Sequence, residues 1–119
     1  MNLTTLRTHC LAKPGTTEER PFGPDTIVFK VMGKMFALAD DHPIPESVNL
    51  KCDPDDALFF RNHFEGIRPG YHMDKRHWIT VQLDGSVPEA LIFELMDDSY
   101  ELVVKGLKKK DRDRLKVEG

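Results

Sequence analysis

Apolar residues at the start of the chain first recur at helical spacing and then give way to residues typical of turns. Leu3, Leu6 and Cys10 lie one helical turn apart, and Pro14 and Gly15 follow them, which predicts a short amphipathic helix. The stretch 16–25 contains two prolines and a glycine. We expect it to be an ordered connection that leads into a strand near Thr26.

The next segments have the composition of strands. Two runs, Ile27–Val31 and Met35–Leu38, are rich in β-branched and aromatic or other apolar residues and flank a short connection that contains Gly33, which predicts a hairpin. Two prolines make 40–46 a loop. After it, Val48–Lys51 alternates apolar and polar residues, as a half-buried strand does.

A second helix and two more strands follow. Asp53 and Pro54 are a strong helix start, and we expect this helix to run to Phe64, before Gly66. We predict strands over Ile67–Met73 and Trp78–Leu83. The helix is expected to bury Ala57, Phe60 and Phe64.

The last predicted element is a long helix. Ser86 and Glu89 have capping-box spacing, and apolar residues then recur at helical spacing from Leu91 to Val103. The order α-β-β-β-α-β-β-α predicts an α+β domain with two layers, in which helices cover a mostly antiparallel, five-stranded sheet. We assign residues 1–110 to this single domain and residues 111–119 to a charged C-terminal tail.

The charge balance argues against a uniformly basic molecule. The 119 residues carry a formal charge of −3, so contact with DNA would require a local basic patch. Lys105–Lys116 holds seven Lys and Arg residues against two Asp residues. We interpret this stretch as a solvated helix end followed by the tail.

The remaining composition points to a soluble intracellular protein. The chain has 39% hydrophobic and 31% charged residues, with no apolar run long enough for a signal peptide or a bilayer span. Cys10 and Cys52 lie too far apart to indicate a zinc site or a disulfide framework, so we expect reduced, buried thiols. We expect a cytoplasmic monomer that is not an enzyme, binds no cofactor and does not act at a membrane.

Several motifs occur in an order that is typical of one family. They are Phe22-Gly23-Pro24-Asp25, Gly33-Lys34-Met35-Phe36-Ala37, Asn49-Leu50-Lys51-Cys52-Asp53-Pro54, Arg68-Pro69-Gly70-Tyr71-His72-Met73 and Lys75-Arg76-His77-Trp78. With these motifs the chain resembles the MmcQ/YjbR family of small bacterial proteins from about Pro14 to Leu107. The resemblance implies a fold similar to that of CyaY and frataxin, and binding of double-stranded DNA through wing-like hairpins. Many relatives have Asn where this chain has Asp74, which places a negative charge beside the proposed basic contact.

The candidate DNA-binding residues lie in the segment 68–78, where cations and flat aromatic rings are interleaved. They are Arg68, His72, Lys75, Arg76 and Trp78. If Ile79 and Val81 face the core, Trp78 lies on the opposite face of its strand and is available to stack on or wedge between bases, while the cations contact phosphates. Four or five phosphate contacts predict a salt slope of roughly −4 in the logarithm of affinity.

Three alternatives stay open on the same residues. The exposed aromatic patch could instead bind a protein partner. His72, Asp74 and His77 could bind a metal ion in a frataxin-like manner, although neighbouring Lys and Arg would repel a cation. Trp78 could also cover the sheet edge or pack under the first helix, with Lys75 and Arg76 simply solvating a turn. Cys52 is a weak candidate nucleophile, and the scattered glycines form no phosphate-binding loop.

Overall fold

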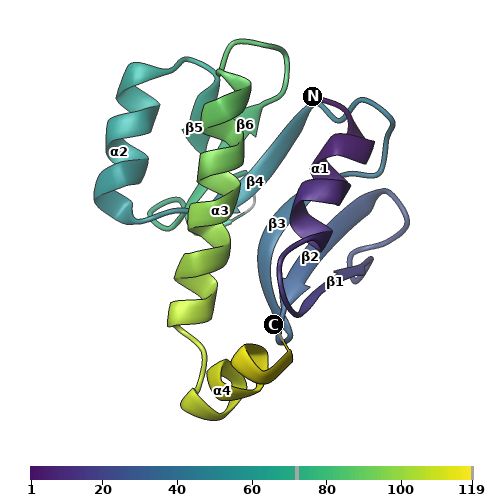
Figure 1. Ribbon diagram of the computed structural model, residues 1–119. Coiled ribbons are helices and arrows are strands. Elements are labelled where there is room, and N and C mark those ends of the chain that lie inside the picture. Colours follow the sequence, from purple (N-terminus) through teal and green to yellow (C-terminus); the bar gives the residue numbers. More distant parts are fainter. Residues whose placement is uncertain (72, 119) are drawn as a thin grey trace.

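The computed structural model describes residues 1–71 and 73–118 and contains one antiparallel sheet in the order β1-β2-β3-β4-β6-β5 (Figure 1). The strands are β1 (Thr16–Glu19), β2 (Thr26–Val31), β3 (Lys34–Asp40), β4 (Ser47–Lys51), β5 (Ile67–Pro69) and β6 (Trp78–Gln82). The helices are α1 (Leu3–Leu11), α2 (Pro54–His63), α3 (Glu89–Lys105) and α4 (Lys109–Glu118). The order of elements therefore confirms the α+β class.

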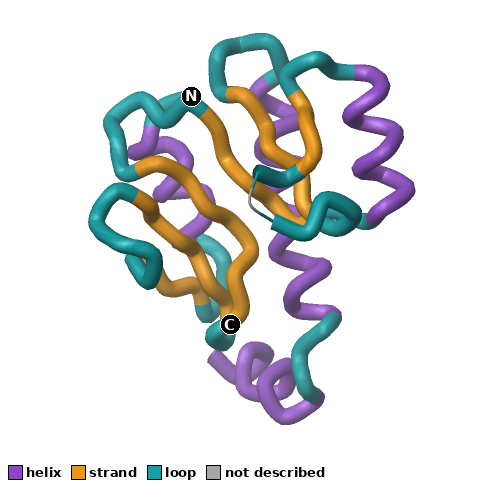
Figure 2. The backbone as a smooth tube through the Cα atoms, turned by 180° about the vertical axis from the view of Figure 1, so that it is seen from behind, coloured by secondary structure: helices purple, strands orange, loops and turns teal. Residues whose placement is uncertain are grey.

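The helices pack on one face of this sheet. Figure 1 shows α1 and α3 in front of the strands, and Figure 2, from behind, shows the strands with no helix in front of them. Alternating strand residues such as Phe29, Leu50 and Ile79 are fully buried in the main core, and α3 packs across β2, β3 and β4. We refer to the other side, which no described helix covers, as the open face.

A buried serine joins α3 to the sheet. The Ser99 hydroxyl donates to the Phe36 carbonyl oxygen at 2.6 Å and accepts the Lys51 backbone N–H at 2.8 Å. Ser99 is fully buried, so removing one of its hydrogen-bond partners would leave a buried polar group unsatisfied and lower the stability of the fold by about 1–3 kcal/mol. They set the position of α3 across β3 and β4.

The prediction of five strands was wrong, because β1 lies where we expected a connection. Thr16–Glu19 pairs antiparallel with Val28–Val31 at the edge of the sheet. All four residues of β1 are polar. An edge strand needs few apolar side chains, so a search for hydrophobic alternation passes over it.

Strand β5 is shorter than predicted. It ends at Pro69, and one further bond joins the Gly70 N–H to the Trp78 carbonyl oxygen at 2.9 Å. Tyr71 lies in a turn and Met73 in a bend, although strand was expected as far as Met73, and Lys75–His77 form a further turn. Helix α2 also ends one residue early, with Phe64 as its C-cap.

The predicted capping box does not form. Pro88 occupies the N-cap of α3 and makes no side-chain cap bond. The Ser86 hydroxyl instead donates to the Asp84 carboxylate at 2.6 Å, and the Ser86 N–H donates to the same oxygen at 3.0 Å. Ser86 therefore stabilises the Asp84-Gly85 turn instead of capping the helix as the pattern had predicted.

Residues 109–118 form a helix that packs on the domain. Residues assigned to a charged tail lie in α4, and Leu115 belongs to the main core cluster with 7% of its surface exposed. Leu115 lies directly over Gly15, where an added Cβ would overlap the leucine side chain. No helix within the described residues is long and apolar enough to cross a membrane.

Candidate nucleic-acid interface

Asp74 organises the turn that presents Lys75 and Arg76. Its carboxylate accepts the Arg76 backbone N–H at 2.9 Å and pairs with His77 Nδ1 at 2.9 Å. The Arg76 N–H, and then His77, hold the pKa of Asp74 below its usual range. Lys75 and Arg76 are exposed, but the ionised Asp74 carboxylate lies beside them in the same turn, so this turn is only weakly basic.

Trp78 is on the predicted face of the sheet but is not exposed there. Ile79 and Val81 point into the main core, as expected. Trp78 packs on the open face against Val28 and Leu38 and keeps only 9% of its surface exposed. The prediction of an exposed Trp78 was therefore wrong, and in this conformation the ring cannot stack on a base or wedge between bases.

The other predicted contact residues lie near this turn. Arg68 is exposed on β5, opposite Thr80, and contributes a little to lowering the pKa of Asp84, for which Ser86 is the main cause. The Lys75 ammonium lies 3.4 Å from the Gly70 carbonyl oxygen, just beyond the end of β5. His72, the fifth predicted residue, lies outside the described residues.

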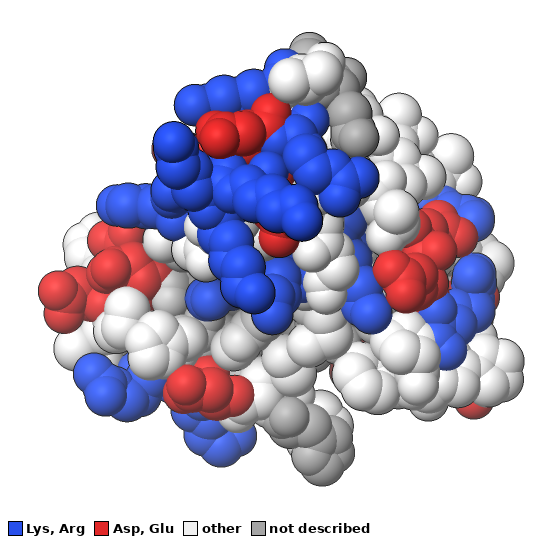
Figure 3. Space-filling model, turned by 90° about the horizontal axis from the view of Figure 1, so that it is seen from below, with Lys and Arg blue, Asp and Glu red and all other residues white. Residues whose placement is uncertain are grey.

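A larger basic surface lies on α4. Figure 3 shows Lys and Arg side chains gathered over this helix on the face seen from below. Residues 105–119 hold seven Lys and Arg against three Asp and Glu, a net charge of +4, so the rest of the chain carries −7. The exposed cations of this α4 face are Lys108, Lys109, Lys110, Arg114 and Lys116.

Arg112 has a structural role and is not counted in the α4 face. Its guanidinium donates to the Lys105 carbonyl oxygen at 3.2 Å, which satisfies an unpaired carbonyl in the last turn of α3. The signal for the α4 face was present in the sequence as a run of cations. Sequence reasoning gave it too little weight because a run of cations looks the same in a tail and on an ordered face.

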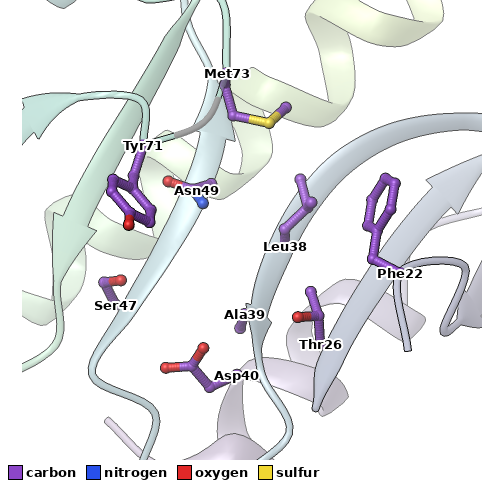
Figure 4. Close-up of a pocket in the computed structure, with 9 residues that line it drawn as sticks. All are labelled: Phe22, Thr26, Leu38, Ala39, Asp40, Ser47, Asn49, Tyr71 and Met73. Atoms are coloured by element: carbon purple, nitrogen blue, oxygen red, sulfur yellow. The ribbon is translucent and has the colours of Figure 1, made fainter. Parts of the chain in front are cut away.

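The open face contains a hollow of about 340 Å³ (Figure 4). Phe22 and Tyr71 stand at its two sides, with 62% and 67% of their surfaces exposed. Leu38 lies between them, and Asp40 and Asn49 supply polar groups. This hollow was not predicted, because its residues come from four separate segments of the chain.

The cysteines and histidines of the described residues do not assemble a reactive or metal-binding site. Cys10 and Cys52 are both free and buried, and burial raises the pKa of each thiol to about 12, so both are protonated at neutral pH. Within residues 1–71 and 73–118, no group of three His, Cys, Asp or Glu side chains could hold a metal ion. The His77 imidazole pairs with the Asp74 carboxylate.

Comparisons with known proteins agree with this fold. The family model described as YjbR matches residues 11–102. The chain is 34% identical to the uncharacterized protein YjbR of Escherichia coli K12 over 97% of this chain and 98% of that protein. It is 44% identical to the uncharacterized protein YbdF of Escherichia coli O157:H7 over 81% of this chain and 79% of that protein. The chain is also similar to the crystal structure of Deinococcus radiodurans protein DR2400, with 40% sequence identity and a TM-score of 0.85; the match covers 96% of this chain and 87% of that chain.

Proposed function

The chain belongs to the YjbR family, and we propose that it binds duplex DNA through phosphate contacts made by the α4 face. The observation that supports the proposal is the separation of charge: a net +4 lies within residues 105–119 of a chain whose remainder carries −7. Phosphate contacts supply most of the affinity of sequence-independent DNA binding.

The geometry of α4 suits a phosphate backbone. Leu115 anchors the helix to the core, so the exposed cations are held on an ordered surface and do not have to be ordered on binding. No aromatic side chain lies in α4, and its two aspartates would be repelled by phosphates. We therefore expect binding that shows little preference among base sequences.

The cations near β5 form a second candidate contact. Arg68, Lys75 and Arg76 are exposed, but Asp74 and Asp84 lie beside them and reduce the local positive charge. We therefore propose that these three residues contribute less than the α4 face.

Fluorescence anisotropy of a labelled duplex, titrated with protein at several salt concentrations, tests the proposal. Four or five phosphate contacts predict a slope of roughly −4 when the logarithm of affinity is plotted against the logarithm of salt. Lys109→Gln/Lys110→Gln should weaken binding and make the slope shallower by about 2. Lys75→Gln/Arg76→Gln removes the same charge from the turn and serves as the matched control.

The two variants separate the possible outcomes. A larger loss for the α4 variant supports the proposal. A larger loss for the turn variant would move the contact to the segment that contains Arg68, Lys75 and Arg76. Failure to bind even at low salt would exclude DNA binding by either surface.

A further inference from the structure

The hollow on the open face has the shape and lining of a small-ligand site. Its volume of about 340 Å³ lies at the lower end of the roughly 300–1,000 Å³ typical of ligand pockets. Leu38 and Met73 give it an apolar lining, and Phe22 and Tyr71 add two exposed aromatic rings from different loops (Figure 4). Large aromatic side chains that stay exposed around a concave surface indicate a binding surface.

Hydrogen bonds to the sheet hold one wall of the hollow in place. The Tyr71 backbone N–H donates to Thr80 Oγ1 at 3.0 Å, and that hydroxyl donates in turn to Asn49 Oδ1. Because Thr80 uses its only proton on Asn49, the amide of Asn49 presents its oxygen to Thr80. Tyr71 is therefore tied to β6 and β4 through its backbone.

The charge around the hollow favours a cation. Asp40 lines it, and no cation pairs with the Asp40 carboxylate among the ion pairs of the described residues. The neighbouring Asp41 does have a partner, because Arg20 donates to it at 2.8 Å. Asp25 and Glu46 line an adjoining hollow together with Asp40 and Asp41, which adds further negative charge at this edge.

We propose that the hollow binds a guanidinium group, with the Asp40 carboxylate accepting two of its N–H groups. A guanidinium is planar and weakly hydrated, so it can stack on Phe22 or Tyr71 while it forms paired hydrogen bonds with a carboxylate. The aliphatic part of the ligand then lies on Leu38 and Met73. A lysine-type ammonium matches the charge but can neither stack nor bond in this paired manner.

This site is separate from the α4 face. It lies on the open face beside Asp40, and Arg68 lines an adjoining hollow together with Asp40 and Tyr71, whereas the α4 face is basic. The guanidinium can belong to a small free compound or to an arginine side chain of a polypeptide. Both sources share the same recognition chemistry, so the experiment uses one probe of each kind.

Trp78 supplies an internal reporter. It is the only tryptophan in the chain, and it packs against Leu38 and Met73, which both line the hollow. We expect agmatine and N-acetyl-arginine-N-methylamide to change Trp78 emission saturably at low salt. N-acetyl-lysine-N-methylamide should bind at least several-fold more weakly than its arginine counterpart.

Variants localise the binding. Asp40→Asn removes the charged acceptor and should weaken both guanidinium probes by roughly tenfold or more, since hydrogen bonds to charged groups contribute about 1.5–3 kcal/mol. Asp25→Asn removes the same charge from the adjoining hollow and should change affinity by less than about threefold. Unchanged thermal midpoints would confirm that both variants fold, and a Tyr71→Ala/Phe22→Ala double variant should also lose binding.

The outcomes are distinct. Tighter binding of the blocked arginine than of agmatine assigns the site to a polypeptide side chain, and the reverse assigns it to a free compound. Equal binding of the lysine probe, an unchanged affinity in Asp40→Asn, or no saturable response to either guanidinium probe at low salt would overturn the proposal.

Discussion

Gly70 is the residue at which the chain leaves β5, and it lies close against β6. A Cβ on Gly70 would lie 2.7 Å from the Trp78 Cβ and 3.0 Å from the Trp78 carbonyl oxygen. Backbone atoms of a paired strand cannot move aside at low cost, so we predict that Gly70→Ala lowers the free energy of unfolding by about 2 kcal/mol. Urea denaturation followed by Trp78 fluorescence measures the change.

Gly106→Ala is the matched control for this substitution. Gly106 has right-handed backbone angles at the C-cap of α3, and its Cβ would meet other atoms only at 3.6 Å. The same added methyl group should therefore be neutral or stabilise by up to about 1 kcal/mol. Equal effects of the two substitutions would contradict the importance of the close approach at Gly70.

Trp78 shows what residue-level sequence reasoning can and cannot recover. Alternation along β6 correctly placed Trp78 on the face opposite Ile79 and Val81. It could not show that Met73, from the turn before the strand, packs over the same cluster. Periodicity gives the side of a sheet to which a residue belongs, whereas exposure depends on segments that are distant along the chain or irregular.

Among the elements, α1 is joined to β1 by a carboxylate that bridges two arginines. Arg7 donates to both oxygens of Glu18 at 2.8 and 2.7 Å, and Arg20 lies 3.5 Å from the same group. The bonds from Arg7 are the main reason that the pKa of Glu18 lies below its usual 4.5. The folded state therefore holds this proton less tightly than the unfolded state.

This difference predicts a stability that depends on pH. The contribution of Glu18 is fully present above pH 4.5 and is lost as pH falls through the lower pKa of the folded state. Glu18→Gln should cost about 1 kcal/mol at pH 7, because Arg7 is partly exposed, and less at pH 3. Urea denaturation of wild type and variant at both pH values measures it.

Glu65→Gln provides the comparison, because Glu65 is exposed beyond the end of α2. It should change stability by less than about 0.5 kcal/mol at either pH. A cost of Glu18→Gln that is equal at pH 7 and pH 3 would show that the charge of Glu18 does not contribute.

Leu115 is the anchor of α4, and its removal tests whether the helix is docked. It is 7% exposed and belongs to the main core cluster. Leu115→Ala should lower the free energy of unfolding by about 2 kcal/mol, the lower end of the range for buried leucines, because the site lies at the margin of the core. Val117→Ala, at a side chain that is 87% exposed, should have almost no effect.

The elements that sequence reasoning recovered are those with an apolar pattern. The β2–β3 hairpin, α2 and α3 were all predicted close to their observed bounds. The hairpin and α3 have buried residues at the expected spacing, whereas α2 buries Ala57 and only partly buries Phe60 and Phe64. Strand β1 and helix α4 have few apolar residues, and Leu115 is the single buried side chain among the residues of α4 whose burial the structure describes. Such elements depend on the surface they pack against, which is not visible from local composition.

At the scale of the whole molecule, charge is separated between two regions. The formal charge of −3 conceals +4 within residues 105–119 and −7 in the rest. The run of cations was evident in the sequence, but its meaning depended on α4 being ordered, and that in turn depended on Leu115. The proposed DNA-binding surface and the fold therefore could not be predicted separately.

This separation predicts chromatographic behaviour that net charge alone does not. At pH 7.5, above the sequence pI of about 5.9, the protein should still bind a phosphocellulose column, because a local patch interacts with a surface over about a Debye length, roughly 10 Å in 0.1 M salt. Lys109→Gln/Lys110→Gln should elute at a clearly lower salt concentration than Lys75→Gln/Arg76→Gln, although both variants have the same net charge. Coincident elution of the two variants would mean that retention follows net charge and that the α4 face does not act as a unit. Because a phosphate matrix carries no bases, retention would also show that the patch recognises phosphate without any contribution from base contacts.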